Sequence, residues 1–190
     1  ATRYRVIYLA GQVALTQELL EILIRFVERG GRVVLDAPGG AYNERGVVLP
    51  TAAGSPFERL FGVELADLQY SNNVPRLLDG QRLHGFIHEL RPARAQVVAR
   101  FHTGEPAVTE YRLDKGTALV LAFDASFACF RPGNTRMESQ IRRYTLGALE
   151  SPYACDGAIV CRIAAPAADH YFFINDDEAK TVRLDTKRYR

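Results

Sequence analysis

Two short, nearly uninterrupted apolar runs enclose an amphipathic segment at the start of the chain. The runs cover residues 5–10 and 32–36, and their length and β-branched content predict strands buried on both faces, as in a parallel sheet. Between them, Thr16 is placed to cap a helix whose apolar residues recur at helical spacing as far as Arg29, where two glycines follow. Strand, helix and strand in this order predict a right-handed parallel crossover unit.

In the stretch after the second predicted strand, apolar residues do not recur at the spacing of a helix or a strand. Residues 41–54 are typical of a long loop. Ser55 and Pro56 then indicate a helix start, because serine can accept a hydrogen bond from the first turn and proline fits there without losing a helical bond. Glu58 stands where a carboxylate can reach back to the cap residue and complete a capping box. We expect a short helix here, followed by an extended segment over 63–70.

Three strand-like runs and one helical segment follow. The runs cover residues 97–101, 107–113 and 117–123, and short turns containing Gly, Pro and Asp separate them. Apolar residues at helical spacing then predict a helix over 137–149.

The pattern changes after a Ser-Pro pair that follows this helix. Residues 158–163, 170–175 and 181–184 alternate between apolar and polar positions, which is typical of antiparallel strands with one buried face. Three such strands would bury only a very small core, so we expect more strands in the native protein. The chain therefore divides into an α/β domain over 1–152 and a small β-domain, or part of one, over 153–190.

These elements together predict an α/β fold of the flavodoxin-like class. Residues 6–9, 33–36 and 119–123 are expected to lie in one mostly parallel sheet. The helices over 16–29 and 137–149 are expected to flank this sheet. A small antiparallel β-segment would follow it.

Composition narrows the function classes. The chain has 190 residues, 47% of them hydrophobic, and a net charge of +2 without a concentrated basic face, which argues against nucleic acid as a partner. No apolar run approaches the roughly 20 residues that span a bilayer, so we expect no membrane partner. Cys129, Cys155 and Cys161 are odd in number and lack metal-ligand spacing. They are typical of reduced thiols in a cytoplasmic protein, with a Cys155–Cys161 disulfide as the alternative.

No convincing catalytic nucleophile is present. In doubly wound sheets a nucleophile occupies the sharp turn after a central strand. The turn over 36–40 has no Ser, Cys or Thr, and Pro38 also removes a backbone donor. Cys129 follows the last strand of the sheet instead, and between two aromatic residues it is more typical of a small buried thiol than of a displaced nucleophile.

Metal and cofactor sites are not expected either. His84 and His88 are four residues apart beside Glu89, a spacing that would bring two imidazoles together on a helix, but no third ligand completes a known signature. Gly39 and Gly40 lack the lysine and the immediate helix of a phosphate-binding loop. We therefore predict no metal and no cofactor.

Two carboxylates and one polar cluster remain as candidates for a binding site. Asp36 and Asp124 each follow a strand predicted to be parallel, at the edge of the sheet where such folds place their sites. Capping of the adjoining loops is the alternative role for both. Asn43, Glu44 and Arg45 lie in the long loop and could join them in a ligand site or an interface.

Several segments, taken in order, resemble the middle domain of bacterial β-galactosidases, the so-called trimerisation domain. They are residues 3–10, 26–31, 33–35, 42–46, 57–63 and 110–118. The segment after Pro152 resembles the start of the small C-terminal β-domain of that family. The resemblance implies a fold related to class I glutamine amidotransferases and a role in assembling a glycoside hydrolase.

The resemblance transfers no catalytic residue. Amidotransferases need a cysteine in the turn after a central strand and a late His-x-Glu sequence, and neither is in place here. In the β-galactosidases, the two catalytic carboxylates lie on an earlier barrel domain. The chain also starts directly on a strand where the family would have a preceding strand and helix, so we expect a fragment.

Three functions compete on this basis. The first is a non-catalytic assembly or scaffold domain of a β-galactosidase-like hydrolase in carbohydrate metabolism, whose partners are further copies or a neighbouring catalytic domain. The second is a small-molecule or sugar-binding module that uses the carboxyl edge of the sheet. The third is an amidotransferase-like enzyme with Cys129 as an atypical nucleophile. For the first, we expect residues 43–50 to lie at a domain or subunit contact, because Val47 and Val48 are apolar within a long loop.

Overall fold

The computed structural model describes most of the first 149 residues and short parts of the remainder. The chain separates into two compact units, Ala1–Gly147 and Ala148–Arg190. The Ser-Pro pair at 151–152, where we placed the domain boundary, lies outside the described residues, as does Cys155. The described residues are 4–129, 134, 136–149, 153–154, 159–164, 169–174, 181 and 183–184, with side chains at 4–71, 76–129, 134, 136–149 and 181.

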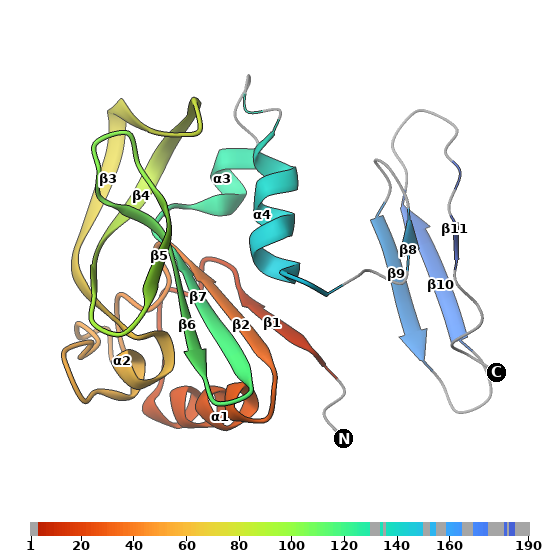
Figure 1. Ribbon diagram of the computed structural model, residues 1–190, viewed down its shortest axis with the longest axis horizontal. Helices are drawn as coiled ribbons and strands as arrows, with labels where there is room; N and C mark the ends of the chain where they lie inside the picture. Colours follow the sequence, from red (N-terminus) through yellow and green to blue (C-terminus); the bar gives the residue numbers. More distant parts are fainter. Residues whose placement is uncertain are drawn as a thin grey trace. The chain divides into compact units, whose positions relative to one another are not determined.

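The first unit is built on a five-stranded mixed sheet with the strand order β1-β2-β7-β6-β5 (Figure 1). β1 (Val6–Leu9), β2 (Arg32–Asp36) and β7 (Gly116–Leu121) are parallel. β6 (Pro106–Leu113) runs antiparallel to β7, and β5 (Gln96–Arg100) runs antiparallel to β6. The prediction that the first three strands share one sheet is confirmed, but the description of that sheet as mostly parallel is only partly right.

The sheet is mixed because a short turn joins two of its neighbours. Asp114 and Lys115 alone separate β6 from β7, and Asp114 has a φ of 52°. A turn of this length can join only antiparallel strands. β1 also differs from expectation, since it is an edge strand whose residues are partly buried rather than buried on both faces.

The first helix, α1 (Gln17–Glu28), forms as its pattern predicts. The Thr16 hydroxyl accepts a hydrogen bond from the Leu19 amide at 3.0 Å and so caps the first turn. The helix packs against β7 and against α2 (Pro56–Phe61). Its apolar face is buried in the core through Leu20, Leu23, Ile24, Phe26 and Val27.

The cap of α2 is confirmed with one difference. The Ser55 side chain accepts from the Glu58 amide at 3.1 Å, as expected. The Glu58 carboxylate, however, does not return to the cap residue. It accepts from the Gly54 amide at 3.2 Å and pairs with Arg94 at 2.8 Å. Glu58 is only 6% exposed, so this ion pair fixes the buried start of α2 to the segment before β5.

A long two-stranded antiparallel ribbon is the main feature that we did not predict. It consists of β3 (Val63–Leu78) and β4 (Gln81–Pro92), where we expected only an extended segment over 63–70 (Figure 1). An isolated bridge from Ile87 to Phe123 joins the ribbon to the end of β7. The ribbon therefore stands beside the carboxyl end of the parallel strands.

Two helices follow β7. α3 (Ala125–Cys129) lies in a segment for which we predicted no helix or strand, and α4 (Met137–Leu146) is three residues shorter than predicted. Arg32 at the start of β2 holds the end of α4, because its guanidinium donates to the Tyr144 carbonyl at 2.8 Å and pairs with Glu110 at 3.0 Å. A cation at a helix C-terminus is also favoured by the helix dipole.

The second unit contains short antiparallel pairs. β9 (Ile159–Ala164) pairs with β10 (Asp169–Ile174), and β8 (Tyr153–Ala154) pairs with β11 (Arg183–Leu184). The expected runs over 158–163 and 170–175 match β9 and β10 to within one residue, whereas β11 covers only the last two residues of the run expected over 181–184. Among the described residues of the whole chain, no helix is long and apolar enough to cross a membrane.

Candidate functional site

The carboxyl end of β2 carries a buried carboxylate that organises its surroundings. Asp36 is 1% exposed. Its carboxylate accepts a hydrogen bond from the Tyr8 hydroxyl at 2.9 Å and from the Gly11 amide at 2.6 Å. Burial raises the pKa of Asp36, and the two hydrogen bonds oppose that effect. Burial, followed by the nearby Asp36 charge, also raises the pKa of Tyr8.

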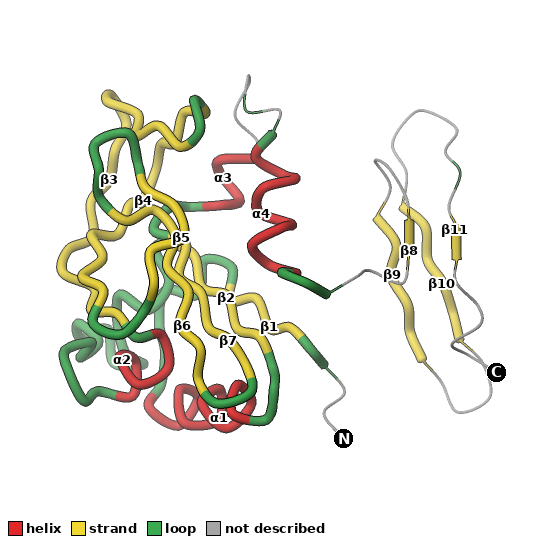
Figure 2. Tube along the Cα trace, in the orientation of Figure 1, coloured by secondary structure: helices red, strands yellow, loops and turns green. Residues whose placement is uncertain are grey.

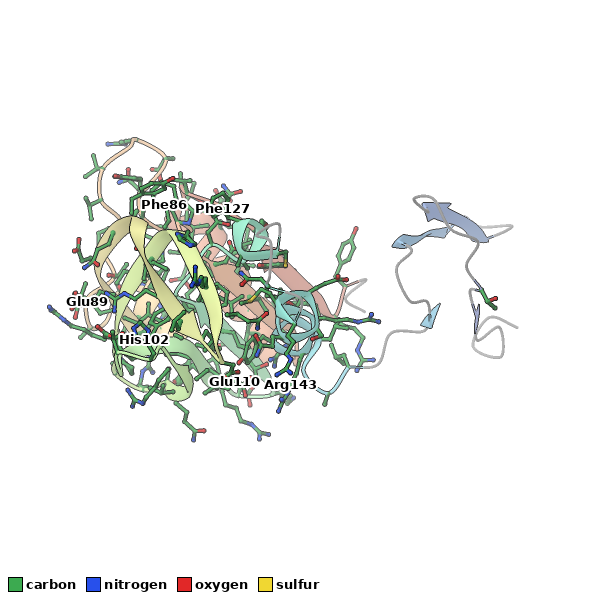
Figure 3. The ribbon with its side chains drawn as sticks, turned by 90° about the horizontal axis from the view of Figure 1, so that it is seen from above. Phe86, Glu89, His102, Glu110, Phe127 and Arg143 are labelled. Carbon is green, nitrogen blue, oxygen red and sulfur yellow. The ribbon has the colours of Figure 1, made fainter. Side chains whose placement is uncertain are left out.

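Asp124 lies near Asp36 but has its own partner. Its carboxylate accepts from the Phe127 amide at 2.9 Å and so caps the start of α3. The Asp124 amide in turn donates to the Phe86 carbonyl of β4 at 3.2 Å. Figure 3 shows Phe127 at the same end of the molecule as Phe86. Both carboxylates thus hold loops in place, and a ligand-binding role for them remains a prediction that this geometry does not favour.

Cys129 is exposed, which corrects the expectation of a buried thiol. It ends α3, and the cause of its exposure is that this short helix buries Ala125 and Ala128 instead. Partial burial and the nearby Glu138 raise the pKa of the Cys129 thiol. A reactive cysteine needs a lowered pKa, because the thiolate is the nucleophile. The environment of Cys129 therefore does not support nucleophilic catalysis.

The connection between β2 and α2 contains loop, drawn in green in Figure 2. Within it, residues 42–48 fold back as a small hairpin, with an antiparallel bridge between Tyr42 and Val48. The Asn43 side-chain oxygen accepts from the amides of Arg45 at 2.9 Å and Val47 at 3.1 Å, which fixes the tip. Glu44 and Arg45 are exposed on this tip. No hydrogen bond or ion pair among the described residues connects this tip to Asp36 or Asp124, so the structure does not bring the five candidates into one site.

The 42–48 hairpin presents apolar side chains to solvent. Val47 is 59% exposed and Val48 is 71% exposed. Tyr42, at 39%, pairs with Val48 across the hairpin, and its amide donates to the carbonyl of Val13, itself 40% exposed. These four residues, which we call the hairpin patch, lie on three neighbouring backbone segments. Leu49 is buried and anchors the hairpin to the core.

His88 is a further residue of interest that we did not single out for its actual role. It lies with His84 on strand β4 rather than on a helix, and it is 2% exposed. Its Nε2 atom is 3.0 Å from the Gly39 carbonyl oxygen, so it links the ribbon to the turn after β2. Burial lowers the pKa of His88, against smaller opposing effects of the Gly39 and Asp67 backbones. The sequence signal that could have indicated this role is a histidine among the apolar residues of a strand.

A cavity of about 330 Å³ lies between the 42–48 hairpin and the first half of β3. Tyr42 and Val48 line it on the hairpin side, Leu68 and Asp67 on the β3 side, and His88 also contributes. In the described part of the chain, no group of three or more His, Cys, Asp or Glu residues is close enough to hold a metal ion.

Comparison with protein families identifies the domain. The family model of the β-galactosidase trimerisation domain matches residues 1–139. The chain belongs to this family. The resemblance noted from the sequence and the assembly role that it implies are therefore confirmed.

Several solved structures of similar fold are β-galactosidases. Gan42B, a GH42 β-galactosidase from G. stearothermophilus, matches with a TM-score of 0.71 at 20% sequence identity, over 96% of this chain and 28% of that chain. The enzyme from Bacillus circulans sp. alkalophilus matches with a TM-score of 0.59 at 17% identity, over 87% of this chain and 26% of that chain. The enzyme from the haloarchaeon Halorubrum lacusprofundi matches with a TM-score of 0.59 at 15% identity, over 80% and 23%.

The similarity between this chain and these structures is a similarity of fold. At such low identity they show the fold, and this chain spans little more than a quarter of the length of Gan42B. No curated protein matches the chain in sequence. The relation to glutamine amidotransferases remains a prediction.

Proposed function

We propose that this chain assembles copies of a cytoplasmic β-galactosidase-type glycoside hydrolase through the hairpin patch. Family membership supports the assembly role, and the fold of the similar structures supports the link to β-galactoside hydrolysis. We assign no catalytic residue to the chain itself. Within the proposed protein, we assign residues 1–152 to an α/β domain and residues 153–190 to a small β-domain or part of one.

The observation that carries the contact site is the exposure of the hairpin patch. Val47 and Val48 are more than half exposed although they are apolar, and the tip around them is held rigid by Asn43. Burial of apolar surface contributes about 25 cal/mol per Å², so a fixed, exposed apolar projection is well suited to a contact with another subunit. A rigid projection also loses little conformational entropy when it binds.

The charged residues of the tip fit the edge of such a contact. Glu44 and Arg45 are exposed next to Val47 and Val48. In subunit interfaces, apolar residues commonly form the centre and charged residues the rim, where they affect orientation more than affinity. We propose this rim role for Glu44 and Arg45, with Asn43 as the residue that fixes the shape of the tip.

Amide hydrogen exchange at low and high protein concentration tests the contact site. We expect the amides of residues 42–48 to exchange more slowly at high concentration, because association covers the hairpin. Val48→Asp should abolish this dependence, since it places a charge in the apolar centre of the contact. Val98→Asp is the matched control, because Val98 is 51% exposed on β5. Equal exchange at both concentrations, or the same loss in the control, would rule out this contact.

A further inference from the structure

A second cavity, of about 360 Å³, lies between the ribbon of β3 and β4 and the connection from β5 to β6. On the ribbon, Gln69 and Ile87 are paired, and Glu89 is two positions further along β4. Side chains of successive strand residues point to opposite faces, so these three share one face of the ribbon, and all three line the cavity. Phe101 lines it from the β5–β6 connection. Figure 3 shows Glu89 and His102, which adjoins Phe101, on the same side of the molecule.

Hydrogen bonds hold the two walls of this cavity together. The His102 amide donates to the Leu77 carbonyl of β3 at 2.9 Å, and Nδ1 of His102 accepts from the Leu77 amide at 3.0 Å. The Arg76 guanidinium donates to the Glu105 carboxylate at 2.7 Å and to the Thr103 hydroxyl at 2.9 Å. These bonds fix the shape of the cavity, and a fixed cavity lowers the entropic cost of binding a ligand.

The charged side chains at this cavity balance one another. Arg76 is paired with Glu105 at 2.7 Å, and Glu89 lies 3.8 Å from Arg91 of the same strand. The side chains of Arg76, Glu89 and Glu105 are 24%, 45% and 43% exposed, so a ligand can reach them. A charged ligand would lose its hydration without meeting an unopposed charge, which is costly. Guanidinium donors beside carboxylate acceptors instead favour a neutral ligand that both donates and accepts hydrogen bonds.

The floor of the cavity is apolar. Ile87, Leu90 and Phe101 are buried and line it, and the half-buried Pro106 lies beside them. Contact with such a surface is favourable for C–H groups. A sugar ring combines a C–H face with hydroxyl groups around its edge, so it matches both the floor and the charged rim. The cavity volume is at the lower end of the range of small-molecule sites.

We propose that this cavity, which we call the ribbon cavity, binds a neutral sugar of monosaccharide size. One hydroxyl donates to the Glu89 carboxylate, another accepts from the Arg76 guanidinium, and the C–H face of the ring lies against the apolar floor. None of the four residues of the hairpin patch lines the ribbon cavity, so this site does not depend on the assembly contact.

Titration of the full chain with D-galactose and D-glucose, followed by NMR, tests the site. We expect saturable binding of at least one sugar, with a change in the chemical shift of the Nε–H group of Arg76. The Nε–H group of Arg94, which donates to Glu58 away from the cavity, should not change. Acetate, 1,4-diaminobutane and glycine are the anionic, cationic and zwitterionic comparisons. Binding of one of these at Arg76 as tight as that of the sugars, or the absence of any saturable shift there, would overturn the proposal.

Matched variants separate sugar binding from folding. Glu89→Ala removes a carboxylate from the cavity wall, whereas Glu64→Ala makes the same change on the ribbon outside the cavity. We expect Glu89→Ala to weaken sugar binding about fivefold, as for the loss of one hydrogen bond, and Glu64→Ala to leave it unchanged. Urea unfolding checks that both variants are folded, and equal affinity in the pair would contradict the proposal. Val48→Asp should bind the sugar as the native chain does, which distinguishes this site from the assembly contact.

Discussion

At the scale of single residues, buried polar side chains hold the loops around the carboxyl end of the parallel strands. Asp36 connects Tyr8 and Gly11, and His88 connects the ribbon to Gly39. The sequence indicated Asp36, because a carboxylate at the carboxyl end of a buried strand is conspicuous. It could not indicate the role of His88, since that role depends on the pairing of β4 with β3 and on the turn that meets it.

The buried state of His88 leads to a pH prediction. Its pKa is lowered from the ordinary value of 6.5, so the unfolded chain takes up a proton before the folded chain does. The free energy of unfolding should therefore fall as the pH drops from about 7 towards 5, by up to about 1.4 kcal/mol for each unit that separates the two pKa values. Urea unfolding across this range measures it. In the His88→Gln variant, the free energy of unfolding should depend less on pH. If its pH dependence equals that of the native chain, groups other than His88 cause the loss of stability.

At the scale of elements, the capping residues predicted the helices more accurately than the alternation of apolar and polar residues predicted the strands. Thr16 and Ser55 cap α1 and α2 as expected, because a cap depends only on residues one turn apart. The ribbon of β3 and β4 was missed although Asp79 and Gly80 form a two-residue turn of a kind that favours hairpins. Shifts of register in β3, together with an Asn-Asn-Val-Pro stretch over 72–75, break the alternation that would have revealed a strand.

The junction between α2 and β3 gives a prediction at this scale. Gly62 ends α2 with a φ of 66°, and an added Cβ would lie 2.8 Å from the Tyr111 ring and 2.9 Å from the Ala95 amide nitrogen. Gly54 has a φ of 83°, but nothing lies within 4 Å of its added Cβ. We expect Gly54→Ala to cost about 1 kcal/mol from the backbone alone, and Gly62→Ala to cost about 3 kcal/mol because the clash is added. Urea unfolding compares them, and equal losses would show that the packing around Gly62 relaxes freely.

At the scale of the whole molecule, the sequence predicted the parallel centre of the sheet but not its full composition. β1, β2 and β7 are recognisable because each is a short apolar run, and two of them flank an amphipathic helix. The strand order and the position of β1 at an edge depend on long-range pairing, which single-sequence patterns do not encode. The five candidate residues likewise separate into loop-holding carboxylates and an exposed hairpin tip, because the course of the loop over 41–54 is set by packing.

An edge strand and an exposed hairpin are both features through which a domain can meet a partner. β1 is an edge of the five-stranded sheet, and edge strands have backbone groups available for pairing. The hairpin patch offers apolar surface instead. We favour the patch as the contact between copies.

Sedimentation equilibrium of the chain over a wide range of concentrations tests the assembly role most directly. One copy has a mass of 21.2 kDa. We predict an average mass that rises with concentration above this value and approaches that of three copies, as expected of a trimerisation domain. A mass of one copy at every concentration would contradict the claim that this chain, by itself, carries a surface for assembly.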